Sequence, residues 1–249
     1  WERRVRVAEI TFDNSMENKR PVGFLAKATK LLLFVNSRPT TSLGVSGKEP
    51  AKEWFEEWDL ASGRPTRTWP LGFPVGANGP RSVVSPDDSS VITNVDGLAL
   101  VRTRFTRDGT ERLELRSQPG RFMDRGSFSP NGHWFAVGSP HNVVDLIDVD
   151  HWQKVAMLGS VLNMMYSTAF SPDGQRLAAG SGNDEAMLLW DLPTRERVLT
   201  LAAEGFGFRN AAFSPDGNAF GATSGRVLHL WRAPSMAEIA AAEKEGKWR

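Results

Sequence analysis

The residue types best suited to catalysis or metal binding are widely scattered in this sequence. The four histidines form no His-Glu-x-x-His pair and no other close ligand spacing. No Gly-x-Ser-x-Gly segment is present, so the nucleophile elbow of the α/β-hydrolases is missing. The chain has no Cys, which excludes disulfide frameworks, thiol nucleophiles and Cys-ligated metal sites. We therefore expect no catalytic residue, no cofactor and no resident metal ion.

Three weaker motifs have simpler structural interpretations. The segment 44–49, Gly-Val-Ser-Gly-Lys-Glu, resembles a phosphate loop but has the wrong spacing, and we interpret it as part of an inserted loop. Asn94–Gly97 and Asn183–Glu185 could attract calcium, yet neither continues into a full ligand set. The arginines between Arg102 and Arg116 alternate with acids and have no interleaved aromatic platform. This pattern favours a solvated outer face and not a nucleic-acid surface.

Composition also limits the possible partners. The 249 residues include 30 Lys+Arg and 29 Asp+Glu, and the formal net charge of +1 gives no bulk attraction to polyanions. The longest apolar runs, such as Leu31–Val35, are too short to cross a bilayer, so we expect a soluble globular chain without membrane insertion. The first residue is Trp1, which suggests a fragment or a processed chain whose upstream targeting segment is missing. A cytoplasmic location is favoured.

A repeated turn sets the organisation of the chain. Ser129-Pro-Asn-Gly, Ser171-Pro-Asp-Gly and Ser214-Pro-Asp-Gly recur at spacings of 42 and 43 residues, and Ser85-Pro-Asp-Asp lies 44 residues before the first of them. Ser, Pro, Asp and Gly at successive positions suit a tight hairpin turn. A second marker follows each turn, as in Met187–Leu192 and Val227–Arg232. One period therefore predicts about four short strands.

The turns together with the Trp-Asp strand ends, such as Trp58-Asp59 and Trp190-Asp191, resemble the WD40 repeat. The resemblance covers about residues 1–233. It implies an all-β, WD40-like β-propeller of about five four-stranded blades, either a closed five-bladed ring or part of a seven-bladed wheel. The Gly-His dipeptide usual in the family is absent. The C-terminal sequence is similar to the last repeats of large bacterial regulatory proteins, some of which carry a serine/threonine kinase domain.

The expected domain boundaries follow from this frame. Residues 1–234 would form the propeller, with 36–53 as an inserted loop, and 235–249 a short helical tail that begins at a capping box. The chain ends its last blade at Trp231 without an outer strand, so Arg3–Ile10 could complete that blade as a latch. A closed ring would make the chain a monomer. An open arc would leave unpaired edges, which favour association.

Function is expected at the surface. The innermost strands, such as Ser82–Val84 and Asn210–Phe213, are small and apolar without an acidic residue, which disfavours an acid/base pair in the channel. In the WD40 strand order, the loops between blades share one face with those between second and third strands. Aromatic and Met side chains there are candidate anchors for a protein or peptide partner. They are Phe73, Phe122, Met164, Met165, Phe206 and Phe208.

The same six side chains have a second interpretation, in which each fills the gap between adjacent blades. We expect a non-catalytic protein-interaction scaffold that is a module of a larger bacterial protein. The alternative is a propeller hydrolase or lactonase with a metal-assisted site in the central channel.

Overall fold

The structure of this chain is a computed structural model, and it describes residues 17–37, 52–72, 81–95, 97–116, 126–139, 142–159, 165–181 and 187–233. All regular elements in these ranges are β-strands. The all-β class expected from the period is thus confirmed. The helical tail 235–249 and the strand Arg3–Ile10 lie outside the described residues, as does most of the inserted loop.

The strands form five antiparallel sheets, here called blades 1 to 5 in chain order. Blade 1 contains β1 (Glu17–Leu25), β2 (Lys30–Ser37), β3 (Lys52–Asp59) and β4 (Arg64–Pro70). Blade 2 contains β5 (Arg81–Val84), β6 (Ser90–Val95), β7 (Ala99–Thr106) and β8 (Gly109–Arg116). Blade 3 contains β9 (Ser127–Phe128), β10 (Trp134–Ser139), β11 (Val143–Asp148) and β12 (Gln153–Leu158).

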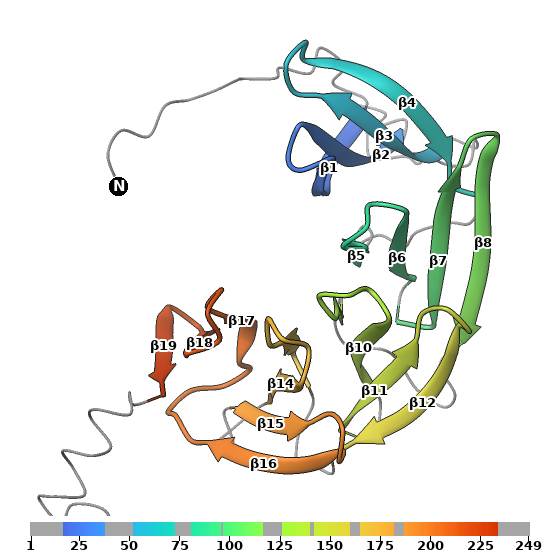
Figure 1. The fold of residues 1–249 in the computed structure, drawn as a ribbon. Helices are drawn as coiled ribbons and strands as arrows, with labels where there is room; N and C mark the ends of the chain where they lie inside the picture. The colour runs from blue at the N-terminus through green and yellow to red at the C-terminus, as the bar shows by residue number, and fades with distance from the viewer. Residues whose placement is uncertain are drawn as a thin grey trace, which may run out of the picture. The chain divides into compact units, whose positions relative to one another are not determined.

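Blade 4 contains β13 (Ser167–Phe170), β14 (Arg176–Gly180), β15 (Met187–Asp191) and β16 (Glu196–Leu201). Blade 5 contains β17 (Arg209–Phe213), β18 (Ala219–Ser224) and β19 (Val227–Arg232). Each blade pairs its strands in chain order, as expected for the blades of a WD40 β-propeller (Figure 1). The chain divides into two compact units, residues 1–125 with blades 1 and 2, and residues 126–249 with blades 3 to 5. The single propeller domain over 1–234 stays a prediction.

The repeated Ser-Pro turns join the first two strands of blades 2 to 5. In blade 4, the Ser171 hydroxyl donates to Asp173 Oδ1 (2.5 Å) and accepts from the backbone N–H of Arg176 (2.9 Å). The same two contacts recur at Ser85, Ser129 and Ser214. The hydrogen bond from Ser171 holds the pKa of the Asp173 carboxyl below its ordinary value. The hydroxyl therefore closes each hairpin from inside, which explains why the tetrapeptide repeats.

Within unit 126–249, apolar side chains pack blade against blade. One cluster joins Leu146 and Leu158 of blade 3 to Leu188 and Trp190 of blade 4. The next cluster joins Met187 and Leu189 of blade 4 to Phe220 and Trp231 of blade 5. The alternation of the third strand explains both clusters, because successive side chains of β15 point to opposite faces of the sheet. Blade 4 is thus apolar on both faces of its sheet.

One face of blade 1 carries a buried carboxylate that is hydrogen-bonded to three side chains. The Glu56 carboxylate accepts hydrogen bonds from Lys19 Nζ (2.8 Å), Trp54 Nε1 (2.9 Å) and Trp58 Nε1 (2.8 Å). Burial of Glu56 raises its pKa, but these three donors outweigh burial, so the pKa is lowered overall. On the opposite face Leu32, Phe34 and Phe55 are buried in a cluster that reaches Val91 of blade 2.

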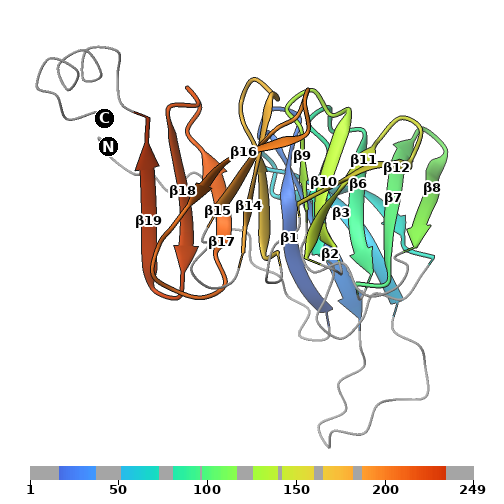
Figure 2. The same ribbon diagram turned by 90° about the horizontal axis from the view of Figure 1, so that it is seen from below.

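Blade 5 has three strands among the described residues, as the strand count from the sequence predicts. Figure 2 shows β17, β18 and β19 side by side, and within its sheet β19 is hydrogen-bonded to β18. Leu228 and Leu230 on β19 are 60% and 73% exposed. Their counterparts in blade 4, Met187 and Leu189, are 0% and 9% exposed because blade 5 covers them. The same repeat position is core in one blade and surface in the next.

We predict that the two leucines at this shared position contribute very differently to stability. Leu189→Ala should lower the free energy of unfolding by about 2–4 kcal/mol, because it removes a buried side chain between two blades. Leu230→Ala should change it by less than about 0.5 kcal/mol. Chemical denaturation of both variants measures the difference. An equally large loss at Leu230 would contradict the described exposure and would mean that another segment covers β19.

Candidate functional site

Three side chains gather at the end of unit 126–249 where the inner strands β13 and β17 begin. Phe206 is 65% exposed, and its ring lies edge-on to Tyr166 with 5.9 Å between centroids. The Arg209 guanidinium lies 4.9 Å from the centre of the Tyr166 ring, at cation–π distance. We call Tyr166, Phe206 and Arg209 the aromatic cluster. It presents an apolar ring and a cation side by side at the surface.

The loop that carries Phe206 is fixed by hydrogen bonds on both sides of it. The Phe206 N–H donates to Ser224 Oγ (2.9 Å), and that hydroxyl donates back to the Phe206 carbonyl (3.2 Å). Phe208 donates its N–H to the Ser181 carbonyl (3.0 Å) and accepts a hydrogen bond from Ser167 Oγ (3.0 Å). Ordering this loop therefore costs little further entropy when a partner binds, which favours affinity.

Two glycines give this loop its path. Gly205 has φ 140°, and a Cβ there would collide with Ser224 Oγ. Gly207 has φ 68°, a left-handed conformation that Gly adopts without steric cost. The two glycines flank Phe206 and turn the chain there, so that the Phe206 ring faces solvent while the Phe208 ring faces the core.

A β-bulge at the start of β17 sets the position of Arg209. The pairing of β17 with β18 shifts register between Arg209 and Ala212, and Asn210 has a positive φ of 53°. Asn210 Nδ2 donates to Thr223 Oγ1 (3.0 Å), which donates in turn to the Arg209 carbonyl (3.1 Å). The matching strand β13 pairs with β14 without a bulge. Bulges of this kind re-aim a side chain, here over Tyr166.

The six side chains expected to bind a partner fall into three groups. Phe73, Phe122 and Met164 lie outside the described residues. Met165 and Phe208 are 0% exposed and belong to the two clusters between blades, so the gap-filling interpretation describes them and a partner cannot touch them in this state. Phe206 is exposed, and for it the partner-binding interpretation stays a prediction.

Sequence reasoning missed Tyr166 and Arg209. Both precede the serine of the next turn by five residues, whereas the two buried plugs, Met165 and Phe208, precede it by six. Aligning the loops on the turn serine would have separated the plug position from the surface position. Tyr166 is also the single tyrosine of the chain, a residue type that is enriched at interfaces.

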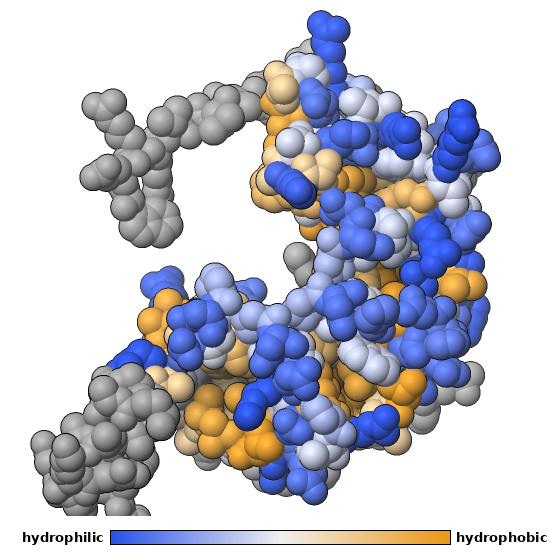
Figure 3. Space-filling model, viewed as in Figure 1, coloured by the Kyte–Doolittle hydropathy of each residue, from blue (hydrophilic) through white to orange (hydrophobic). Residues whose placement is uncertain are grey.

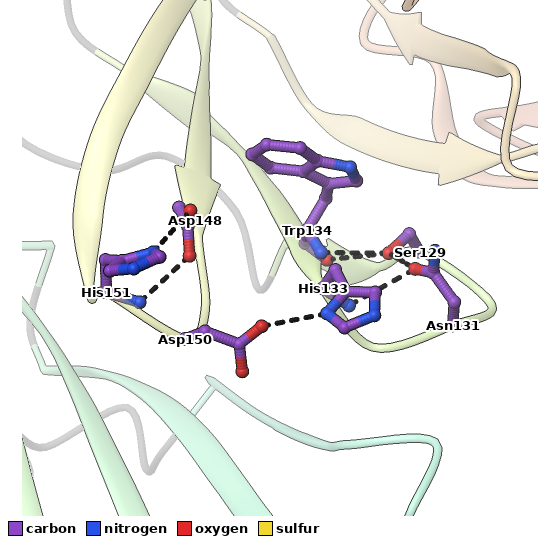
Figure 4. A network of polar contacts seen from close by, with 7 residues as sticks. All are labelled: Ser129, Asn131, His133, Trp134, Asp148, Asp150 and His151. Carbon is purple, nitrogen blue, oxygen red and sulfur yellow. Dashed lines mark hydrogen bonds and ion pairs between the residues drawn. The ribbon is translucent and has the colours of Figure 1, made fainter.

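Two histidines of blade 3 form exposed pairs with carboxylates (Figure 4). His133 Nδ1 lies 2.8 Å from Asp150 Oδ2, and His151 Nδ1 lies 2.9 Å from Asp148 Oδ2. The nearby Ser129 hydroxyl bonds Asn131 and the Trp134 backbone, so it serves the turn and not a His-activated nucleophile. The arrangement is two His–carboxylate hydrogen bonds at hairpin ends, not a Ser-His-Asp triad.

No group of three or more His, Asp or Glu side chains among the described residues could hold a metal ion. The inner strands β9, β13 and β17 contain no Asp or Glu, and Ser127 Oγ and Thr168 Oγ1 bond each other at 2.9 Å. Within the described ranges, no helix is long and apolar enough to cross a membrane.

Comparisons with known proteins agree with this repeat geometry. Residues 159–191, which run from the end of blade 3 through β15, match the WD domain, G-beta repeat family. In this segment the chain is similar to a WD40 repeat. It is 31% identical over 105 residues to an uncharacterized WD repeat-containing protein, sll1491, of Synechocystis sp. (strain ATCC 27184 / PCC 6803 / Kazusa). It is also 33% identical over 98 residues to the WD repeat-containing protein SL1-17 of Schistosoma mansoni.

These matches cover 42% and 39% of this chain but only 30% and 32% of the relatives' own lengths. WD40 repeats generally mediate protein–protein interaction and are typically non-enzymatic scaffolds. At this level the expected function class agrees with the comparisons.

We predict that the two phenylalanines of the loop differ in their effect on folding. Phe208→Ala should lower the free energy of unfolding by about 3–5 kcal/mol, because it empties a core position between blades 4 and 5. Phe206→Ala should cost less than about 1 kcal/mol, because the ring is mostly exposed and loses one edge-on aromatic contact. Thermal or denaturant unfolding measures both. Equal losses at the two positions would contradict the placement of Phe208 in the core.

We predict that the His151–Asp148 pair stabilises the fold only within a limited pH range. The hydrogen bond to Asp148 raises the pKa of His151, and the His151 backbone N–H lowers the pKa of Asp148. The histidine contribution is full below about pH 6.5 and is lost as pH rises through its raised pKa. The Asp148 contribution is present above about pH 4 and is lost as pH falls.

An NMR titration checks this pair directly. The wild-type His151 pKa should lie above the ordinary value, and Asp148→Asn should return it toward that value. A His151 pKa that does not respond to Asp148→Asn would contradict the pairing.

Proposed function

We propose that this chain is a non-catalytic protein-interaction module of a larger bacterial protein, and that it binds a protein or peptide partner through the aromatic cluster. The observation that carries the proposal is Phe206, which is 65% exposed yet held by two hydrogen bonds to Ser224. A rigid, exposed aromatic ring is the usual form of a binding anchor, because it buries apolar area at low entropic cost.

The surroundings of Phe206 support a binding role. Tyr166 backs the ring, and Arg209 adds a cation to the other part of the Tyr166 surface. Tyr, Phe and Arg are the residue types enriched at interface centres.

Other exposed apolar side chains are less well suited to specific binding. Figure 3 shows apolar surface over β15 and β16, and Val198 and Leu199 of β16 are 46% and 47% exposed. These two aliphatic side chains belong to the surface of an outer strand, and neither is an aromatic residue. Scattered exposed aliphatic residues of this kind are normal on protein surfaces.

We predict that removing the Phe206 ring weakens partner capture without unfolding the chain. The wild-type chain, Phe206→Ala and the control Met157→Ala are immobilised and exposed to a bacterial lysate, and bound proteins are quantified by mass spectrometry. Met157 is 67% exposed on the outer strand of blade 3, so it matches Phe206 in exposure but not in position.

Partners enriched on the wild type should fall at least about tenfold on Phe206→Ala, as for a hot-spot residue, and persist on Met157→Ala. Equal capture by all three proteins would overturn the proposal.

A further inference from the structure

We infer that the aromatic cluster recognises a peptide segment that carries an Asp or Glu side chain two positions from an apolar residue, the carboxylate binding Arg209 and the apolar side chain covering Phe206. The inference rests on the proposed function and names the chemistry of its partner. It follows from the pairing state of Arg209, from the bulge that positions it, and from its separation from Phe206.

Arg209 is an exposed cation with no carboxylate partner in the described part of the chain. Its recorded side-chain contact is the face of the Tyr166 ring, which occupies one side of the guanidinium plane. A cation–π contact of this kind does not use the in-plane N–H donors of the guanidinium as a carboxylate partner would. A planar fork of N–H donors fits a carboxylate in a bidentate manner.

A β-bulge and two hydrogen bonds hold the backbone at Arg209 in a defined position. The bulge and the positive φ of Asn210 occur at β17 and not at the equivalent start of β13. Asn210 and Thr223 hydrogen-bond each other and the Arg209 carbonyl, so the backbone that carries the guanidinium is fixed.

The charge around the cluster favours an acidic partner. Arg226 lies on the β18–β19 turn, two residues after the Ser224 that holds Phe206, and it is also exposed. Glu204 of the same loop is the acidic residue nearest in sequence to Phe206 among the described residues. Two arginines against one glutamate leave a local excess of positive charge on a chain whose net charge is only +1.

The spacing of the two anchors sets the expected peptide pattern. Phe206 and Arg209 both contact Tyr166, at 5.9 Å and 4.9 Å from its ring centre, so these groups lie no more than about 11 Å apart. In an extended peptide, side chains at i and i+2 point to the same side and lie about 7 Å apart. A spacing of about 7 Å lies within this limit, so an acid at i and an apolar residue at i+2 can contact both anchors.

A peptide fits this surface better than a single-stranded nucleic acid. Nucleic-acid grooves combine several stacking rings with a track of cations along the phosphate backbone. Here one ring is exposed, and Glu204 interrupts the positive charge. The partner is therefore assigned as an acidic peptide segment, with the anion supplied by a side-chain carboxylate.

The test begins with a displayed library of random 12-residue peptides. The library is selected on the whole wild-type chain and counter-selected on Arg209→Gln. Selected peptides should be enriched in Asp or Glu two positions from an apolar residue. Selected peptides without such enrichment would overturn the inference, and so would a failure to select any peptide.

Binding constants of the selected peptides then test Arg209 itself. Fluorescence polarisation should show about 10- to 100-fold weaker binding by Arg209→Gln, the range of a lost charged hydrogen bond. Arg209→Lys should recover part of the loss, since it keeps the charge but not the fork. Arg197→Gln, which removes an exposed arginine from β16, is the matched control and should bind as the wild type does.

A double-mutant cycle links the two partners. Replacing the peptide acid by its amide should weaken wild-type binding by the same factor as Arg209→Gln, and the two changes together should cost no more than one alone. Independent, additive losses would overturn the assignment of the carboxylate to Arg209. A phosphoserine peptide that binds more than tenfold tighter than the acidic one, or comparable binding of oligo(dT), would overturn the chosen partner class.

The two proposals fail in distinguishable ways. Peptides that lose affinity with Phe206→Ala but not with the acid-to-amide change would keep the interaction surface and reject the acidic partner. Peptides that bind Phe206→Ala and Arg209→Gln as tightly as the wild type would reject both. Thermal unfolding of each variant is compared with the wild type, so that a folding defect is not taken for a binding defect.

Discussion

Blade packing in unit 126–249 depends on one close backbone approach that occurs both between blades 3 and 4 and between blades 4 and 5. A Cβ added to Gly138 would lie 2.8 Å from the Met165 carbonyl oxygen, which is too close. A Cβ added to Gly180 would collide with the Phe208 carbonyl oxygen. Because glycine has no side chain, the backbone that leads into the next blade can pack directly against the end of the second strand. The side chain of the entering residue, Met165 or Phe208, then fills the gap between two blades.

This approach also determines which loop residues face solvent. With Phe208 anchored by Ser167 and Ser181, the two flanking segments have fixed starting points. Gly207 reverses the chain before the anchor, which turns Phe206 outward, and the bulge after it turns Arg209 toward Tyr166. The same packing that buries Phe208 therefore also fixes the backbone on both sides of it, from which Phe206 and Arg209 reach the surface.

Much of the strand order could be predicted from the sequence, because the turn serine, its Asp or Asn and the Trp-Asp strand ends recur in register. Less could be predicted where local chemistry is not repeated. The β1–β2 hairpin turns through Ala26, Lys27 and Ala28, all with positive φ, and nothing in these residue types indicates it. The contact that supports it, from the Ala26 N–H to Asp88 Oδ2 at 2.7 Å, comes from another blade.

In the candidate site, too, some residues could be predicted from the sequence and others could not. Phe206 was predicted as a surface anchor, but Phe208, two residues later, was predicted with it and is core. Residue type could not separate them, because the two glycines that reverse the chain act through backbone angles. Arg209 and Tyr166 were missed because their contact depends on a bulge, and single-sequence patterns do not reveal where a strand shifts register.

The central claim is that binding occurs at the loop end of unit 126–249 and not on the outer strands. Hydrogen–deuterium exchange of the whole chain, with and without a saturating selected peptide, tests it most directly. The account predicts slower exchange in the peptide-bound chain at residues 204–210 and at Tyr166, with β12 and β16 unchanged. Protection confined to the outer strands or to β19, with none at 204–210, would contradict it.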